Sequence, residues 1–350
     1  AILKVDTQPW NETENYQQFA IIESEKERGD IFVSPDIATC DQCRTELFDP
    51  QDRRYLHPFI NCTACGPRLT ILDSMPYDRE RTSMGEFPMC GNCHEEYVNP
   101  ETRRYDAQPV CCNDCGPEVY LIGEEDIRGA AAITRTRQMI AAGGIVAIKG
   151  IGGFHLCCDA TNETAVARLR ELKRRPMKPF AVMARNMSAV RKECQVTEVQ
   201  EEVLDGHQKP ILLLERLDKA DSQICPSVAP GNPKIGVMLP YAPVQLLIFD
   251  YDDGIQMPDY LVMTSGNTSG APICRDDNDA IAELSHLCDC MLSHNRKIRI
   301  RADDSVMDYY KDEPYMIRRS RGYAPLPVMV SAPWKGQVLA VGGELKRSEE

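Results

Sequence analysis

From about residue 125 onward, the chain alternates between segments with helical hydrophobic spacing and short, continuous apolar runs. Residues 130–142 predict a helix that ends at Gly143 and Gly144, and a second helix is expected to begin at Thr161 or Asn162. Buried strands are predicted at residues 145–149, 180–183, 211–214, 261–264 and 315–318. Strands that alternate with helices in this way indicate an α/β fold with a twisted, open sheet.

The remaining segments lack this pattern. Residues 36–120 contain few long apolar runs, so bound metal is expected to supply the core that such a small region lacks. Residues 1–35 predict one strand from Phe19 and then a charged stretch, and residues 338–343 predict the first strand of a further domain. We therefore predict four parts: 1–35 as the tail of one domain with its linker, 36–120 as cysteine-rich units, 121–332 as the α/β domain, and 333–350 as the start of another domain.

Residues 36–120 contain the same cysteine unit twice, fifty residues apart. In each copy, two Cys-x2-Cys pairs are separated by 18 residues. Two such pairs can surround one Zn²⁺ tetrahedrally with thiolates at about 2.3 Å, which leaves no position open for water and makes the metal structural. The predicted ligand sets are Cys40, Cys43, Cys62, Cys65 and Cys90, Cys93, Cys112, Cys115.

The two copies also agree outside the cysteines. Glu46 matches Glu96, and residues 53–55 and 103–105 both have the sequence Arg-Arg-Tyr. Disulfide pairing is the alternative, but eight cysteines in a duplicated metal signature favour zinc. His57 and His94 are not expected to be ligands because four thiolates complete each shell.

Cysteine usage and charge limit the function further. The other cysteines, including Cys111, follow no disulfide framework, which indicates a reducing compartment. We predict a cytoplasmic protein, since the chain has no signal peptide at Ala1 and no apolar run long enough to span a bilayer. The net charge of -13 disfavours sequence-independent nucleic-acid binding, although Arg-Arg-Tyr in both spacers leaves an RNA-binding alternative.

Three features of the α/β part suggest ligand chemistry. Six cations fall within residues 168–178, at a helix end that runs into a proline-flanked loop. Cations at a helix C-terminus can be merely stabilising, but a stiff cationic loop also suits a polyphosphate. The second feature is the polar turn Thr264–Gly270 after a strand, and the third is the Gly-rich turn Lys149–His155, which is neither a P-loop nor a dinucleotide fingerprint. Plain turns remain an alternative for both, yet all three features lie at strand ends.

These residues carry a family resemblance. Lys173-x-Arg175 with Ser265-x-Asn267 resembles the signature of YrdC-like domains, which make carbamoyl-type adenylates from ATP. The tandem cysteine units combined with five further segments resemble the HypF-type carbamoyltransferases of hydrogenase maturation. Those segments are 152–159, 178–183, 236–241, 301–306 and 319–325. Threonylcarbamoyl-adenylate synthases carry a Pro-Thr-Glu-Thr-like turn where this chain has Lys149-Gly-Ile-Gly-Gly, which disfavours that transfer-RNA-modifying branch.

The resemblance implies an acylphosphatase-like domain before the zinc units and an ASKHA-fold domain after the YrdC-like domain, so the chain resembles a middle fragment. It implies that carbamate from carbamoyl phosphate reacts with ATP to give carbamoyl-adenylate, and that the carbamoyl group then passes to the C-terminal cysteine of HypE for cyanide-ligand synthesis. A non-catalytic module that only binds zinc, nucleotide and partners is the other alternative.

The resemblance also suggests residue roles. Lys173 and Arg175 are assigned to the phosphates with Lys178 in support, while Ser265 and Asn267 orient the carbamoyl or phosphate oxygens. Further candidates for binding the nucleotide are Lys149, His155, Thr264 and Arg301, with a structural histidine as the alternative role for His155. Mg²⁺ is expected with the ATP. Asp303 and Asp304 are candidates either to hold it or to pair with Arg299 and Arg301.

Overall fold

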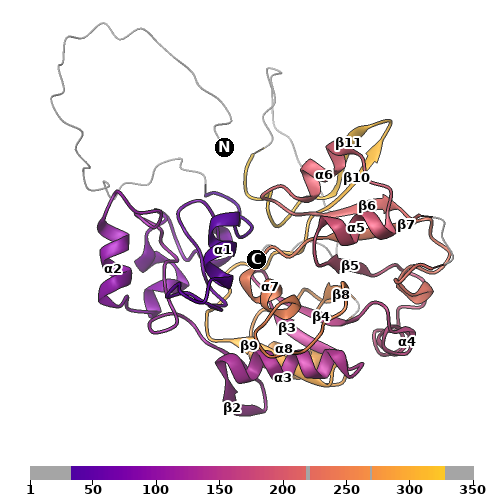
Figure 1. Ribbon diagram of the computed structural model, residues 1–350, viewed down its shortest axis with the longest axis horizontal. Coiled ribbons are helices and arrows are strands. Elements are labelled where there is room, and N and C mark those ends of the chain that lie inside the picture. The colour runs from indigo at the N-terminus through magenta and orange to yellow at the C-terminus, as the bar shows by residue number, and fades with distance from the viewer. Residues whose placement is uncertain (1–32, 218–220, 269, 328–350) are drawn as a thin grey trace, which may run out of the picture. The chain divides into compact units, whose positions relative to one another are not determined.

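An eleven-stranded mixed β-sheet organises the part of the chain that the computed structural model describes, which is residues 33–217, 221–268 and 270–327 (Figure 1). Along the sheet the order is β11-β10-β6-β7-β5-β8-β4-β3-β9-β1-β2. The strands are β1 (Val119–Leu121), β2 (Glu124–Arg128), β3 (Val146–Lys149), β4 (Phe154–Asp159), β5 (Ala181–Ala184), β6 (Ile211–Glu215), β7 (Lys234–Met238), β8 (Tyr260–Ser265), β9 (Cys290–His294), β10 (Val306–Tyr310) and β11 (Glu313–Arg318).

Strand direction brings several loops to one edge of the sheet. β4 is antiparallel to both β3 and β8, and β5 is antiparallel to β8. The end of β8 therefore lies beside the start of β4 and the start of β5. In this register His155 is opposite Ser265 on one side and Ile148 on the other. The predicted sheet is confirmed. Because its strands run in both directions, both strand starts and strand ends lie at this edge.

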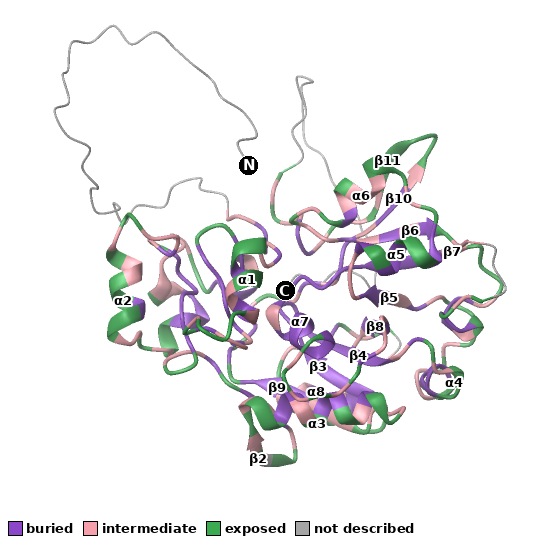
Figure 2. Ribbon diagram, viewed as in Figure 1, coloured by how far each residue is buried: buried purple, intermediate pink, exposed green. Residues whose placement is uncertain are grey.

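Helices cover both faces of the sheet. α3 (Gly129–Ala141) and α7 (Pro243–Phe249) pack on one face, while α4 (Glu163–Leu172), α5 (Met187–Glu193), α6 (Glu198–Leu204) and α8 (Asp277–Leu284) pack on the other. Figure 2 shows the consequence: the central strands and α7 are buried, and the other helices expose their outer sides. None of these described helices has the length and apolar character that a bilayer-spanning helix needs.

The predicted elements of the α/β part are confirmed. The helix predicted at 130–142 is α3, and the one expected from residue 161 or 162 is α4, where the Asn162 side chain accepts a hydrogen bond from Ala165 N. All five predicted strands are present within two residues of their expected bounds. The strands predicted near Phe19 and at 338–343 lie outside the described residues.

The four-cysteine units share their apolar core with the sheet. Each unit has one short helix that begins after its first cysteine, α1 (Asp41–Phe48) and α2 (Gly91–Val98). Leu47 and Phe59 of the first unit are buried in the same apolar cluster as Ile148 and Met263 of the sheet. The expectation that metal alone supplies the core of residues 36–120 is therefore incomplete, because packing against the α/β domain contributes too.

Candidate functional site

The eight predicted ligands form two separate clusters. Cys40, Cys43, Cys62 and Cys65 lie together, as do Cys90, Cys93, Cys112 and Cys115, and within each set the sulfur atoms lie within 4.8 Å of one another. The cysteines therefore group in the predicted sequence order. The neighbouring sulfurs are 3.6–3.8 Å apart in both clusters, which is too long for a disulfide bond of about 2.05 Å.

The spacing of the sulfurs fits zinc. A tetrahedron with Zn–S bonds of about 2.3 Å has edges of about 3.8 Å, close to the distances between these sulfurs. The histidine predicted as a non-ligand in the first unit bonds elsewhere: His57 Nδ1 lies 2.8 Å from Asn113 Oδ1, and Nε2 lies 3.3 Å from Cys111 Sγ. Cys111 is outside both clusters, as expected. When bound, zinc would cross-link the two ends of each unit and perform no chemistry.

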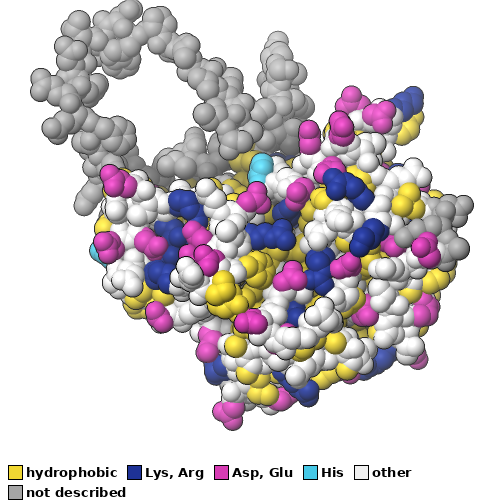
Figure 3. Space-filling model, in the orientation of Figure 1, with side chains coloured by type: hydrophobic (Ala, Val, Ile, Leu, Met, Phe, Trp, Pro, Cys, Tyr) yellow, Lys and Arg dark blue, Asp and Glu magenta, His cyan; other side chains and the backbone are white. Residues whose placement is uncertain are grey.

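Two equivalent ion pairs join the four-cysteine units to each other. Arg54 of the first unit, whose side chain is 1% exposed, forms an ion pair with Glu96 of the second. Arg104 of the second unit forms the equivalent ion pair with Glu46 of the first. Figure 3 shows the result as dark blue cations interleaved with magenta carboxylates over α1 and α2. The charged residues shared by the two copies thus form the interface between them.

Arginines also reach across to the cysteine sulfurs. Arg53 Nη2 lies 2.8 Å from Cys93 Sγ, and both terminal nitrogens of Arg103 lie 3.8 Å from Cys43 Sγ. A four-thiolate zinc centre carries a net negative charge, which these guanidinium groups would partly neutralise. Each unit therefore supplies a cation to the metal site of the other.

The predicted phosphate-binding residues converge at the sheet edge. Lys173 follows α4, and its Nζ donates hydrogen bonds to the carbonyl oxygens of Ser265 (2.8 Å) and Asn267 (2.9 Å). Arg175 Nη1 donates to Thr264 Oγ1 at 3.3 Å. Segments some ninety residues apart thus meet, as the site hypothesis required.

Among the described residues, the two cations of this edge have no carboxylate as a hydrogen-bond partner. Burial, together with the neighbouring Arg175, lowers the pKa of Lys173 to about 8. Burial and the nearby Arg170 lower the pKa of Arg175 to about 10. Among the described residues, no carboxylate is a cause of either shift. Two partly buried cations held together without an anion form a site prepared for one.

The six cations of residues 168–178 separate into different roles. Arg168 pairs with Asp289, while Arg174 and Lys178 are exposed. Sequence reasoning missed the role of Arg170: its buried guanidinium donates to the carbonyls of Arg175 (2.7 Å) and Lys178 (3.2 Å) and so fixes the basic loop. The only signal was its position on the apolar face of α4.

The polar turn after β8 is held by its own side chains. The Ser265 hydroxyl donates to Asn267 Oδ1 at 2.8 Å, and Asn267 Nδ2 donates to the Ala271 carbonyl at 2.6 Å. Gly266 is required by the protein itself, because a Cβ there would lie 2.7 Å from the Phe154 carbonyl oxygen. The close approach that requires a glycine here is therefore to the backbone of β4.

The other nucleotide-binding candidates have internal partners. Lys149 Nζ binds Asp277 (3.1 Å) and the His294 carbonyl (2.9 Å), and Arg301 binds the Ile273 carbonyl and Asp279. Among the described residues, no hydrogen bond or ion pair joins either side chain to Lys173, whose partners are Ser265 and Asn267. The structure brings neither of them into the cation pair.

The acidic pair at residues 303–304 differs from expectation. Asp304 pairs with His155 (2.9 Å) and Arg321 (2.8 Å) rather than with Arg299 or Arg301. Arg299 instead forms ion pairs with Asp73 and Glu86. The predicted pairing was wrong because the side chains that meet Asp304 come from β4 and from the segment after β11.

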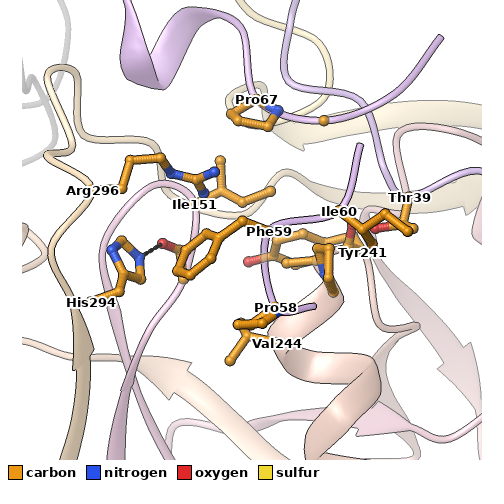
Figure 4. Close-up of a pocket in the computed structure, with 14 residues that line it drawn as sticks. Thr39, Pro58, Phe59, Ile60, Pro67, Ile151, Tyr241, Val244, His294 and Arg296 are labelled. Carbon is orange, nitrogen blue, oxygen red and sulfur yellow. Dashed lines mark hydrogen bonds between the residues drawn. The ribbon is translucent and has the colours of Figure 1, made fainter. Parts of the chain in front are cut away.

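A small cavity marks the junction between the first four-cysteine unit and the α/β domain (Figure 4). Phe59 lies between the His294 ring and Tyr241, and its ring is 5.2 Å from that of His294 in an edge-to-face arrangement. Arg296 lies 4.9 Å from the Phe59 ring centre. At about 10 Å³ the cavity has room for about one water, so it is a packing junction rather than a substrate site.

Comparison with known proteins agrees with this geometry. A family model described as the HypF finger matches residues 39–72 and 89–122, and the Sua5–YciO–YrdC model, described as telomere recombination, matches residues 138–320. Carbamoyltransferase HypF of Synechocystis sp. is 46% identical over 338 residues, which cover 96% of this chain and 43% of that protein. A probable carbamoyltransferase HypF of Methanocaldococcus jannaschii is 42% identical over 98% of this chain and 44% of its own length.

Solved structures show the same likeness. The crystal structure of full-length HypF in a phosphate- and nucleotide-bound form has a TM-score of 0.84 and 44% identity, over 90% of this chain and 41% of that one. T. kodakarensis HypF has a TM-score of 0.81 and 45% identity, over 87% and 39%. The chain spans less than half the length of these relatives. With both finger units and the YrdC-like fold matched, the chain belongs to the HypF family.

Proposed function

We propose that this chain catalyses the adenylation step of a HypF-type carbamoyltransferase, in which carbamate and ATP give carbamoyl-adenylate and pyrophosphate. The observation that carries the proposal is the pair Lys173 and Arg175, held against the turn after β8 with no carboxylate partner in the described part of the chain. Membership of the HypF family supports the choice of substrate.

The reaction needs charge stabilisation more than proton transfer. A carboxylate oxygen of carbamate attacks the α-phosphorus of ATP, a new O–P bond forms, and the bond from the α-phosphorus to the oxygen bridging to the β-phosphate breaks. Pyrophosphate leaves with that electron pair. Lys173 and Arg175 would stabilise the charge that grows on the phosphate oxygens, with Lys178 in support from the exposed side of the loop.

The Ser265–Asn267 turn has a positioning role in this proposal. Its carbonyl groups fix the Lys173 ammonium, and the Ser265 hydroxyl holds the turn in shape by donating to Asn267 Oδ1. Mg²⁺ would screen the phosphate charges. Among the described residues, the sets that could hold a metal ion through three or more His, Cys, Asp or Glu ligands are the two cysteine clusters, so we propose that Mg²⁺ arrives with ATP.

The steps before and after adenylation belong to the rest of a full-length relative. We propose that an acylphosphatase-like domain supplies carbamate from carbamoyl phosphate, and that an ASKHA-fold domain passes the carbamoyl group to the C-terminal cysteine of a HypE-type partner. The zinc units are assigned a structural role, since Phe59 and its neighbours anchor them to the α/β domain.

Exchange of labelled pyrophosphate into ATP tests the proposal directly. Ammonium bicarbonate holds carbamate in equilibrium, whereas sodium bicarbonate and ammonium chloride separately do not. We expect exchange only with carbamate present, and we expect it to be lost in Arg175→Gln and kept in the exposed neighbour variant Arg174→Gln. Exchange that requires bicarbonate and threonine would instead indicate a threonylcarbamoyl-adenylate synthase, and its absence under all conditions would refute adenylation by this chain.

A further inference from the structure

A buried histidine lies next to the cation site and is not explained by phosphate binding. His155 is the second residue of β4, and it stands directly opposite Ser265 of β8. Side chains of directly opposed residues in antiparallel strands project from the same face of the sheet and lie close together. The His155 ring is therefore a neighbour of the turn that holds Lys173.

Asp304 fixes the orientation and the tautomer of this ring. Its Oδ2 lies 2.9 Å from His155 Nε2, and its Oδ1 accepts a hydrogen bond from Arg321 Nε at 2.8 Å. All three side chains are at most 6% exposed. A carboxylate can only accept here, so the shared proton resides on His155 Nε2; in the neutral imidazole the other ring nitrogen, Nδ1, is then an acceptor.

The acceptor nitrogen has no partner among the described residues. Nδ1 faces the Gly-rich turn, where a Cβ added at Gly150 would lie 3.4 Å from it. The His155 side chain itself is only 4% exposed. An oriented, unpaired acceptor next to Ser265 is available to a ligand that carries a donor.

We propose that His155, positioned by Asp304, recognises the amino group of the carbamate by accepting an N–H hydrogen bond at Nδ1. This inference rests on the proposed function and deepens it. Carbamate differs from other small carboxylates in its N–H donors, while Lys173 and Arg175 offer donors only. The carbonyls of Ser265 and Asn267 already accept from Lys173. His155 then supplies the acceptor that cations cannot.

Two substitutions separate recognition from a structural role. In His155→Gln, the amide can still donate to Asp304 from near the Nε2 position, but nothing remains at Nδ1. In His155→Asn, the amide oxygen can take the place of Nδ1, while the link to Asp304 is lost. If Nδ1 recognises carbamate, His155→Asn should retain more carbamate binding than His155→Gln. If the histidine only holds Asp304, His155→Gln should retain more.

The measurement is carbamate-dependent pyrophosphate exchange, with acetate as a competitor that has a methyl group in place of the amino group. We expect His155→Gln to raise the KM for carbamate about tenfold, the loss of one hydrogen bond, while the KM for ATP and the Ki for acetate stay unchanged. His286→Gln, at an exposed histidine, is the control, and thermal unfolding checks that each variant is folded.

The outcomes are distinguishable. Suppose that the wild type shows carbamate-dependent exchange. An unchanged KM for carbamate in His155→Gln, or a lower KM for carbamate in His155→Gln than in His155→Asn, then overturns this inference and leaves the adenylation proposal standing. Equal losses for carbamate and acetate would likewise overturn it, because they indicate a general distortion of the site. Absence of carbamate-dependent exchange in the wild type overturns the proposed function and this inference with it.

Discussion

Replacing Glu96 with Gln should loosen the interface between the two four-cysteine units. Glu96 accepts hydrogen bonds from both terminal nitrogens of Arg54, one of them at 3.0 Å, and a third from Arg53 at 3.3 Å. Gln has nearly the same shape, so the substitution removes the negative charge and one acceptor without creating a cavity. Arg54 then remains buried, at 1% exposure, without its counter-charge.

The size of the effect follows from burial. Removing one partner of a fully buried ion pair costs about 3–5 kcal/mol. The Glu96 side chain is 25% exposed, so water can partly solvate what remains of the pair. Loss of one or two hydrogen bonds to a charged group costs about 1.5–3 kcal/mol. We therefore expect the variant to lose about 2–3 kcal/mol of folding free energy in this region.

Metal affinity provides the assay, because zinc binding and folding of such units are linked. A loss of about 2–3 kcal/mol corresponds to zinc binding about 30- to 150-fold weaker, which competition with a chromogenic chelator can measure. Glu95→Gln is the matched control, since this neighbour on α2 is exposed. If Glu96→Gln holds zinc as tightly as Glu95→Gln does, the reciprocal ion pairs do not stabilise the metal sites and the reasoning is wrong.

Three further predictions concern the cation pair and the junction. Arg175→Gln should weaken ATP binding by about 1.5–3 kcal/mol in a calorimetric titration, while Arg174→Gln binds normally. ATP affinity should fall as the pH rises through about 8, because burial and Arg175 lower the pKa of Lys173 to that value and phosphate binds the protonated form; Lys173→Gln should abolish this pH dependence. Phe59→Ala should cost about 3–5 kcal/mol and speed proteolysis of the finger units, whereas the exposed Val98→Ala should not, as limited digestion can check.

The elements that sequence analysis predicted are those with a clear hydrophobic period or a strong cap. α4 has both: an Asn162 cap and an apolar face that includes Val166 and Leu169. By contrast, β4 includes the polar residues His155 and Asp159, and its sequence follows a Gly-rich turn that hides its start. β7 contains Gly236, which interrupts its apolar run. Such strands are defined by their neighbours in the sheet rather than by their own pattern.

The contacts of the candidate site also differ in whether the sequence could predict them. Lys173 and Ser265 could be associated from the sequence because a family motif joins them. Nothing in the sequence joins His155 to Asp304, which lies 149 residues away, and the nearest cations in the chain suggested a different partner for that carboxylate. The pairing depends on the order of strands in the sheet. Tertiary contacts between polar side chains of this kind require the fold itself.

The charged residues that match between the two copies form the interface between them. The residues that match across the copies outside the cysteines include Arg54 with Arg104 and Glu46 with Glu96, and these are the pairs that join the units reciprocally. A self-complementary interface requires the same residues on both sides, so matched charges in a tandem repeat indicate contact between the copies.

The positions at which the copies differ are equally informative. Residues 58–60 of the first unit are Pro-Phe-Ile, and the equivalent residues 108–110 of the second are Gln-Pro-Val. Phe59 packs against His294 and Arg296 of the α/β domain, whereas its equivalent, Pro109, contacts the first unit, where its carbonyl oxygen accepts a hydrogen bond from Asn61 Nδ2 at 2.8 Å. A symmetric pair of units can dock on an asymmetric domain only if one copy changes its contact surface. The departure from the repeat at residue 59 therefore identifies the docking face, just as the agreement at residues 46 and 96 identifies the internal interface.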